Sequence, residues 1–305
     1  MTHLFILRNK FKVKIAYMLI LTLIILNIFS FSGLFGRTQD GLKLTCFDVK
    51  HGASFFIQFP GGKNMLFDAG TKSNYDVGKF IVVPFLQQKG IKKIDTVVIS
   101  HEHDDHCNGM PSIVKRFRVD NVLVNKFFLQ SGNRVELLRL FKEEKAKTGL
   151  VADGLEIKGY EPAKIMVLNP PDKDLLRNEG FPTKNLSIND SSSVLLIDYK
   201  GYRILLCADI GVRGIEALLS SENDLDIDVI QVPHHGGFCE KTEDLLKRTS
   251  PRHAFISGSA KDISPSTIET CQKYGVSLFK THENGAVTFT IDEDGIKVSK
   301  FLGQD

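Results

Sequence analysis

Residues 101–106 read His101-Glu102-His103-Asp104-Asp105-His106, directly after the apolar run from Thr96 to Ser100. Two histidines two residues apart, followed by an adjacent Asp and His, place four candidate metal ligands on one short loop. Alternate residues of an extended stretch can converge on one point, and imidazole and carboxylate groups suit a divalent ion such as zinc. The stretch therefore predicts a metal site at the end of a buried strand, where ligands are rigidly held.

Further motifs follow in a fixed order along the chain. They are Phe47-Asp48-Val49-Lys50-His51-Gly52-Ala53-Ser54, Leu66-Phe67-Asp68-Ala69-Gly70, Asn189-Asp190-Ser191-Ser192-Ser193-Val194, Leu205 to Asp209 and Val232-Pro233-His234-His235-Gly236-Gly237. With the metal loop, they resemble the ComEC-type, competence-related branch of the metallo-β-lactamase superfamily over roughly residues 43 to 299. The resemblance implies a four-layer αββα metallo-β-lactamase sandwich and metal-dependent hydrolysis.

Composition is consistent with one large globular domain. The chain has 305 residues, of which 42% are hydrophobic and 25% charged, enough to bury a full core. The net charge of +3 gives no strong basic field of the kind that would by itself indicate nucleic-acid binding. Charge therefore neither supports nor excludes a polyanionic substrate.

The N-terminus differs from the rest of the chain. An uncharged stretch from Ile15 to Gly36 follows four basic residues, Arg8, Lys10, Lys12 and Lys14. This pattern predicts one N-terminal membrane segment in residues 1–36, with the N-terminus cytoplasmic and a hydrolase domain, residues 37–305, on the far side of the cell membrane. The alternatives are a cleaved signal peptide using Ser30 and Ser32, which would give a secreted protein, and a buried core helix.

The remaining pattern alternates strands and helices in two halves. Strands are expected at Leu42–Phe47 and Ser54–Phe59, for example, and an amphipathic helix at Asn133–Lys147 that stops at Gly149. The second half repeats this plan from Val194 onward. Such alternation implies an α/β fold in which two sheets pack face to face with helices outside, and in which the site lies at the strand ends.

The resemblance also assigns metal ligands. It makes His101 and His103 ligands of one ion, Asp105 and His106 ligands of a second, and Asp209 a bridge between the two. Two ions about 3.5–4 Å apart can share and activate one hydroxide. We therefore expect one or two divalent ions, with Zn²⁺ favoured and Mn²⁺ as the alternative.

Five other side chains are candidates for the site. His234 and His235 end a strand and point to opposite sides, so one can bind metal while its neighbour contacts substrate or packs; both are candidate catalytic residues, and His235 is also a candidate ligand. Asp68 is expected to accept a ring N–H from a ligand histidine, the alternative being a turn aspartate. Asn189 and Ser192 are expected to bind substrate oxygens or to support the metal loop, unless they form an ordinary turn.

Two departures from the family pattern stand out. No histidine lies between Cys107 and Val232, so the third imidazole that β-lactamases give their first metal is missing. Ser264-Pro265-Ser266 stands where the ComEC-type branch has His-Pro. We expect His51, His253 and His282 not to be ligands. The five cysteines form no disulfide framework, and Cys107 is a less favoured soft ligand.

These observations predict an exported, membrane-tethered metallo-hydrolase. The resemblance to the ComEC-type branch implies that it would cleave DNA or another cell-surface phosphodiester, through a metal-bound hydroxide that Asp105 helps to orient. One alternative is a hydrolase of a small envelope ester, such as a phosphorylcholine or teichoic-acid phosphoester. Another is a non-catalytic module that binds a polyanion through a degenerate site. A β-lactamase is disfavoured by the missing histidine, and no protein partner is indicated.

Overall fold

The computed structural model of the chain describes residues 14, 17–24, 41–171 and 186–303. Residues 1–40 form one unit and Gly41–Asp305 a second, compact one. Residues 17–24 are helical, but most of the membrane segment predicted in residues 1–36 lies outside the described residues. Within the described ranges, no helix has both the length and the apolar character needed to cross a bilayer.

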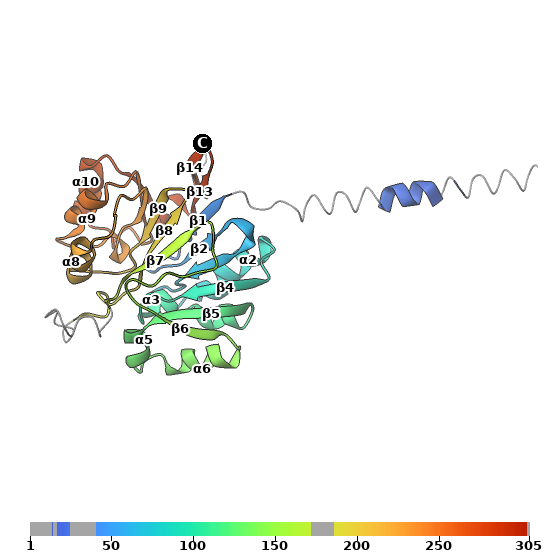
Figure 1. Cartoon of the computed structure of the whole chain (residues 1–305), viewed down its shortest axis with the longest axis horizontal. Helices are drawn as coiled ribbons and strands as arrows, with labels where there is room; N and C mark the ends of the chain where they lie inside the picture. The colour runs from blue at the N-terminus through green and yellow to red at the C-terminus, as the bar shows by residue number, and fades with distance from the viewer. Residues whose placement is uncertain (1–13, 15–16, 25–40, 172–185, 304–305) are drawn as a thin grey trace, which may run out of the picture. The chain divides into compact units, whose positions relative to one another are not determined.

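Two β-sheets form the centre of the second unit (Figure 1). The eight-stranded sheet contains, in spatial order, β14 (Gly295–Lys300), β13 (Val287–Asp292), β1 (Leu42–Cys46), β2 (Phe55–Gln58), β3 (Asn64–Phe67), β4 (Lys93–Val98), β5 (Arg118–Asn125) and β6 (Lys147–Val151). The six-stranded sheet contains β12 (Ser277–Lys280), β11 (His253–Ile256), β10 (Val229–Gln231), β9 (Tyr202–Leu206), β8 (Val194–Tyr199) and β7 (Lys164–Asn169).

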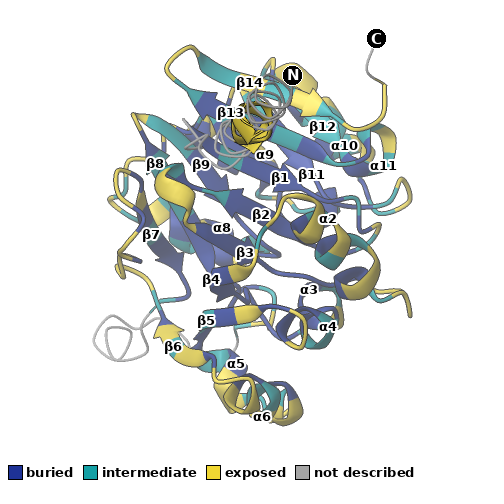
Figure 2. Cartoon of the chain, turned by 90° about the vertical axis from the view of Figure 1, so that its right-hand side faces the viewer, coloured by how far each residue is buried: buried dark blue, intermediate teal, exposed yellow. Residues whose placement is uncertain are grey.

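Helices cover the outer faces of both sheets, so that exposed residues concentrate on the helices and buried ones on the strands (Figure 2). On the eight-stranded sheet they are η2 (Gly78–Val82), α2 (Val83–Gln88), α3 (Asp104–Cys107), α4 (Met110–Val114), α5 (Lys126–Gln130) and α6 (Val135–Glu143). The helices of the second half are α8 (Val212–Ser220), α9 (Thr242–Thr249), α10 (Pro265–Lys273) and α11 (Thr281–Asn284).

Three buried apolar layers hold these elements together. The middle layer joins the inner faces of the sheets, where Phe55 and Phe67 meet Phe255 and Leu206. The outer layers pack helices on sheets, through Phe141 and its neighbours in the first half and through Leu218, Leu246 and Cys271 in the second. Alternation of side chains along a strand gives each sheet its two apolar faces. The predicted α/β fold of two sheets with outer helices is confirmed.

One predicted element was wrong at its end. The helix expected over Asn133–Lys147 ends at Glu143, and Lys147 begins the edge strand β6, which pairs with β5 in parallel. Gly149 lies inside this strand and does not stop a helix. A short, half-exposed edge strand carries little hydrophobic pattern, so the sequence did not separate it from the preceding helix.

The parallel parts of the sheets determine where the site lies. Strands β3, β4 and β5 are parallel in one sheet, and β9, β10 and β11 are parallel in the other. The carboxyl ends of parallel strands meet at one edge, which is where ligand sites form in such sheets. The predicted ligand motifs directly follow β3, β4, β9 and β10 at this edge.

Candidate metal centre

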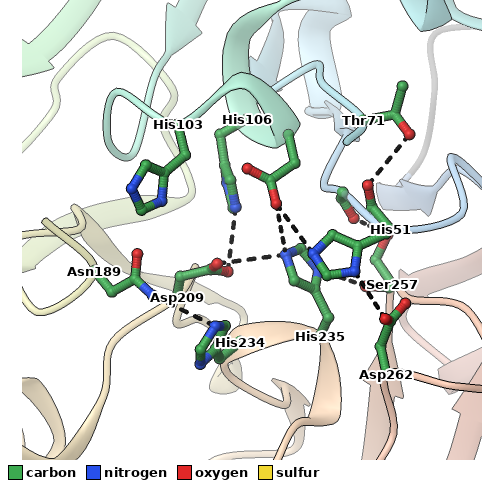
Figure 3. Close-up of polar contacts among 12 residues, drawn as sticks. His51, Thr71, His103, His106, Asn189, Asp209, His234, His235, Ser257 and Asp262 are labelled. Carbon is green, nitrogen blue, oxygen red and sulfur yellow. Dashed lines mark hydrogen bonds and ion pairs between the residues drawn. The ribbon is translucent and has the colours of Figure 1, made fainter. Parts of the chain in front are cut away.

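Four predicted ligands converge in the described part of the chain: Asp105, His106, Asp209 and His235, whose ligand atoms all lie within 4.8 Å of one another. His106 Nε2 is 3.2 Å from Asp209 Oδ1, and His235 Nε2 is 3.3 Å from Asp209 Oδ2 (Figure 3). Ligand atoms about 2.0–2.1 Å from a tetrahedral ion lie about 3.3 Å from each other. The spacing of these side chains therefore suits a single ion among them.

The buried polar atoms of this group test whether it fits a metal. His106 Nε2, Asp209 Oδ1 and His235 Nε2 are inaccessible to solvent, and apart from the ion-pair contacts at 3.2 and 3.3 Å they have no hydrogen-bond partner. A buried polar atom without a partner is costly, and natural proteins rarely keep one without a reason. Three such atoms facing one another from separate loops are explained by a cation that they share. The donor set of imidazole and carboxylate therefore fits a borderline divalent ion.

The pKa shifts of the cluster without an ion also favour a bound cation. Burial lowers the pKa of His235, but the charge of Asp209 and contact with Asp105 outweigh burial and raise that pKa to about 10. For His106, burial is again outweighed, because the charges of Asp209 and Asp68 raise its pKa well above the ordinary value. Burial raises the pKa of Asp209, yet the two histidines bring it well below the ordinary value. The carboxylates thus attract positive charge into a closed site.

Two candidate ligand histidines are oriented through their second ring nitrogen. His106 Nδ1 lies 2.7 Å from Asp68 Oδ2, and His235 Nδ1 lies 2.8 Å from the carbonyl oxygen of Ser257. When each Nδ1–H donates to these oxygens, Nε2 of each ring presents its lone pair to the centre. Asp68 is itself held by the backbone N–H and the hydroxyl of Ser100. Its contact with His106 is the one expected for it from the sequence.

The candidate ligands Asp209 and His235 lie on turns with strained backbone. Ala208, before Asp209, has a φ of 49°, and His235 has a φ of 54°, both in the left-handed region. The buried side chain of Gln231 stabilises the first turn, since it accepts from Ala208 N at 2.7 Å and donates to Ala208 O at 3.0 Å. Strained non-glycine backbone persists where the surroundings enforce it, typically at functional sites.

The first-half loop is fixed by two close contacts. Asn125 at the end of β5 donates to the carbonyl oxygens of Ser100 and Ser191, both at 2.8 Å, and so joins the loops of the two sheets. Gly70 packs directly against the backbone of Asp104, Asp105 and His106, where no Cβ would fit. The position of the metal loop therefore depends on a glycine in a different motif.

Gly70→Ala should displace this loop. The added Cβ would collide with backbone, and overpacking of this kind typically costs about 1–3 kcal/mol of stability. We expect a lower melting temperature and a clear loss of bound metal, measured by elemental analysis. Gly149→Ala is the matched control, because its Cβ meets only the end of the Leu123 side chain. Normal metal content in Gly70→Ala would show that the packing does not position the ligands.

A profile of the Metallo-beta-lactamase superfamily matches residues 48–260, a span that includes all of these ligands. The chain belongs to this superfamily. It is a metal-dependent hydrolase of that superfamily with a candidate metal cluster, as the sequence predicted.

Two curated proteins, one of them named a competence protein, are similar to this chain. ComE operon protein 3 of Bacillus subtilis is 24% identical over 261 residues, which cover 79% of this chain and 32% of that protein. Competence protein ComA of Neisseria gonorrhoeae is 23% identical over 267 residues, covering 86% of this chain and 34% of that protein. The chain thus spans about a third of the length of these relatives. Their names are consistent with the predicted ComEC-type branch.

Solved structures show the same fold. The metallo-beta-lactamase fold protein YhfI of Bacillus subtilis has a TM-score of 0.55 at 11% identity, covering 82% of this chain and all of that one. CmlA, a diiron β-hydroxylase from Streptomyces venezuelae, has a TM-score of 0.52 at 15% identity, covering 82% of this chain and 54% of that one. At these identities the likeness concerns the fold alone.

The other predicted ligands of the superfamily pattern, His101 and His103, lie beside the cluster. His101 Nε2 and His103 Nδ1 face each other at 3.0 Å, close enough to hold one ion together. Burial, with the nearby charge of His106, keeps the pKa of His101 well below its ordinary value, so the ring is neutral. Ser192 is fully buried, and its hydroxyl lies 3.2 Å from His101 Nδ1. Of its two expected roles, the structure therefore favours support of the metal loop over contact with substrate.

His234 and Asn189 lie on the open side. The His234 ring is exposed, and the side-chain amide of Asn189 donates to its Nε2 at 3.4 Å. The adjacent histidines thus point in different directions, with His235 in the cluster and His234 outside it (Figure 3). Cys107 is not a member of the converging group: burial raises the pKa of its thiol to about 12, and its Sγ donates to the carbonyl oxygen of His103.

One residue at the site was not expected from the sequence. His51 lies against the cluster, with its ring 4.5 Å from that of His235 and its Nε2 3.2 Å from Asp105 Oδ2. A histidine in a turn has no local signal that would show this. The prediction that His253 is not a ligand is consistent with its place at the start of β11, the end of the strand away from the site.

Proposed function

We propose that the chain is a membrane-tethered, extracytoplasmic phosphodiesterase acting on DNA or another cell-surface phosphodiester. The observation that carries this proposal is the cluster of Asp105, His106, Asp209 and His235, with its unpartnered buried atoms. The competence-related names of the curated relatives support a DNA-related substrate. The basic flank and apolar stretch of residues 1–36 support the tether and the extracytoplasmic side.

The side chains divide the work of such a reaction. A divalent ion held by the cluster would supply Lewis acidity to a phosphoryl oxygen and make water more acidic. Asp105, the most accessible cluster member at 14% exposure, would orient the attacking water. His234 and Asn189, on the open side, would donate to the phosphoryl oxygens. The buried Asp68 and Ser192 would keep the ligand histidines in place.

A pocket of about 210 Å³ opens beside His101. Phe127, Leu186 and Ile188 contribute an apolar lining, and Ser131 a hydroxyl. The pocket would receive a group attached to the scissile phosphate, such as a base or an alcohol. Its small volume also supports a second candidate, the hydrolysis of a small envelope ester such as a phosphorylcholine or teichoic-acid phosphoester.

Turnover assays test the reaction class. With added manganese or zinc, the full chain should hydrolyse bis(p-nitrophenyl) phosphate and leave a chromogenic cephalosporin intact, since a negatively charged phosphodiester gains more from a bound cation than a neutral amide does. His235→Ala should lose more activity than His234→Ala, because His235 is in the cluster and His234 lies on its open side. Rapid cephalosporin hydrolysis without action on any phosphodiester would contradict the proposal.

A further inference from the structure

His51 is held between two carboxylates at the edge of the metal cluster. Its Nε2 is 3.2 Å from Asp105 Oδ2, and its Nδ1 is 2.9 Å from Asp262 Oδ1. Figure 3 shows the His51 ring beside His235, with Asp262 next to it. At 22% exposure the His51 side chain reaches the surface, but most of it is enclosed. Each ring nitrogen thus has one carboxylate in hydrogen-bonding range.

The backbone around His51 is firmly placed. Its carbonyl oxygen accepts from Lys72 N at 2.8 Å and from the Thr71 hydroxyl at 3.2 Å. Two residues later, Ala53 N donates to the carbonyl oxygen of Asp105 at 2.9 Å. The turn carrying His51 and the metal loop are therefore joined by main-chain as well as side-chain contacts. Such double attachment gives the ring a defined position relative to the Asp105 carboxylate.

Asp262 is equally well placed. Its Oδ2 accepts from the backbone N–H of Ser259 at 3.0 Å and also contacts the Ser259 hydroxyl. It lies in the loop before Ser264, where the chain lacks the histidine of the ComEC-type pattern. Ser264 N donates to Gly236 O at 2.9 Å, which ties this loop to the turn that carries His235. The loop thus contributes a carboxylate to the site.

The placement of His51 favours a role through Asp105 over direct metal binding. His51 is not among the four described residues whose ligand atoms converge within 4.8 Å. Its Nε2 approaches the same Asp105 oxygen that His235 Nε2 reaches at 3.6 Å. A carboxylate with a fixed donor on one side loses rotational freedom and presents its remaining lone pairs in one direction.

We propose that His51 and Asp262 form a positioning pair for the metal site: His51 donates to Asp105 and holds it towards the ion, and Asp262 holds the His51 ring. This inference rests on the proposed function, because it assumes that the cluster binds a catalytic ion. Loss of an outer hydrogen-bond partner of a ligand typically lowers metal affinity about 10–100-fold. The weaker metal affinity should lower activity because a smaller fraction of the protein holds metal.

Metal titration of the full chain tests the pair. Zn²⁺ affinity, measured by competition with a chromogenic chelator, should fall about 10–100-fold in His51→Ala and in Asp262→Ala. The double variant should be no weaker than His51→Ala, because the two residues act in series. Asp262→Asn should retain most of the affinity, since the amide still offers a hydrogen-bonding group to Nδ1 of the ring. His51→Gln should be intermediate, because its amide can still donate.

Controls separate positioning from folding. His253→Ala, a histidine at the opposite end of its strand, should bind Zn²⁺ as the wild type does. Metal-free His51→Gln should melt close to the wild type, and excess metal should restore most of its phosphodiesterase activity. Wild-type affinity in both His51 variants would overturn the inference. A wild type that binds Zn²⁺ but cleaves no phosphodiester would refute the proposed function alone, and one that binds no metal would refute both.

Discussion

Asp209→Ala should remove nearly all phosphodiesterase activity and most of the bound metal. Asp209 is 2% exposed and is the one described carboxylate that contacts both His106 and His235, through different oxygens. Loss of an outer partner of a ligand already costs about 10–100-fold, so loss of this central ligand should cost more than about 100-fold. Metal content by elemental analysis and initial rates on bis(p-nitrophenyl) phosphate would measure both effects.

Asp209→Asn distinguishes charge from shape in this result. The amide has the volume of the carboxylate but lacks its negative charge, so it should bind metal almost as poorly as alanine. Asp226→Ala removes an exposed aspartate from the same half of the chain and should change neither quantity. Full metal content in Asp209→Asn would show that metal binding does not need the negative charge of Asp209.

Metal should stabilise the protein more strongly as pH rises from 6 to 9. Without metal, His235 has a pKa of about 10 and that of His106 is also raised, so both rings hold protons at neutral pH. An ion can bind only when these protons leave, and its affinity therefore increases with pH. At a metal concentration near 1,000 times Kd, metal binding would raise the free energy of unfolding by about 4 kcal/mol and the melting temperature by roughly 10 °C.

The metal-free protein should show the opposite trend. A histidine with a raised pKa stabilises the folded state fully below the unfolded value near 6.5, and this contribution is lost as pH rises towards 10. Asp209, with a lowered pKa, stabilises above the ordinary value near 3.8 and loses this contribution as pH falls. Melting curves with and without Zn²⁺ between pH 6 and 9 would test the histidine trend, and metal-free curves at acidic pH would test the Asp209 trend. A metal-induced shift that is constant with pH would contradict the assigned protonation states, and His235→Ala should flatten the dependence.

The sequence could predict which candidate ligands come together, because these residues follow buried strands in recognisable motifs. Asp105, His106, Asp209 and His235 all lie beyond apolar runs that form β4, β9 and β10. In parallel strands, residues after such runs must meet at one edge, so strand pattern and motif together were enough to bring them into one site.

The supporting residues could not be predicted in the same way. His51 and Asp262 are far apart in the chain, and each has an ordinary loop context; only the packing of the two sheets brings them together. Gln231 looks like one polar residue in an apolar strand, yet its side chain holds the turn before Asp209. These contacts depend on the direction in which each side chain points in the folded protein. The periodicity of hydrophobic residues along the sequence does not predict that direction.

The division of ligands between the two sheets has a consequence for how the protein opens. Asp105 and His106 come from the eight-stranded half, and Asp209 and His235 from the six-stranded half. Neither half alone has a complete set, so an ion bound by all four would cross-link the two halves much as a disulfide would, but reversibly. Breathing motions that separate the sheets would then have to release the ion first, and the lifetime of the closed sandwich would depend on how fast metal dissociates.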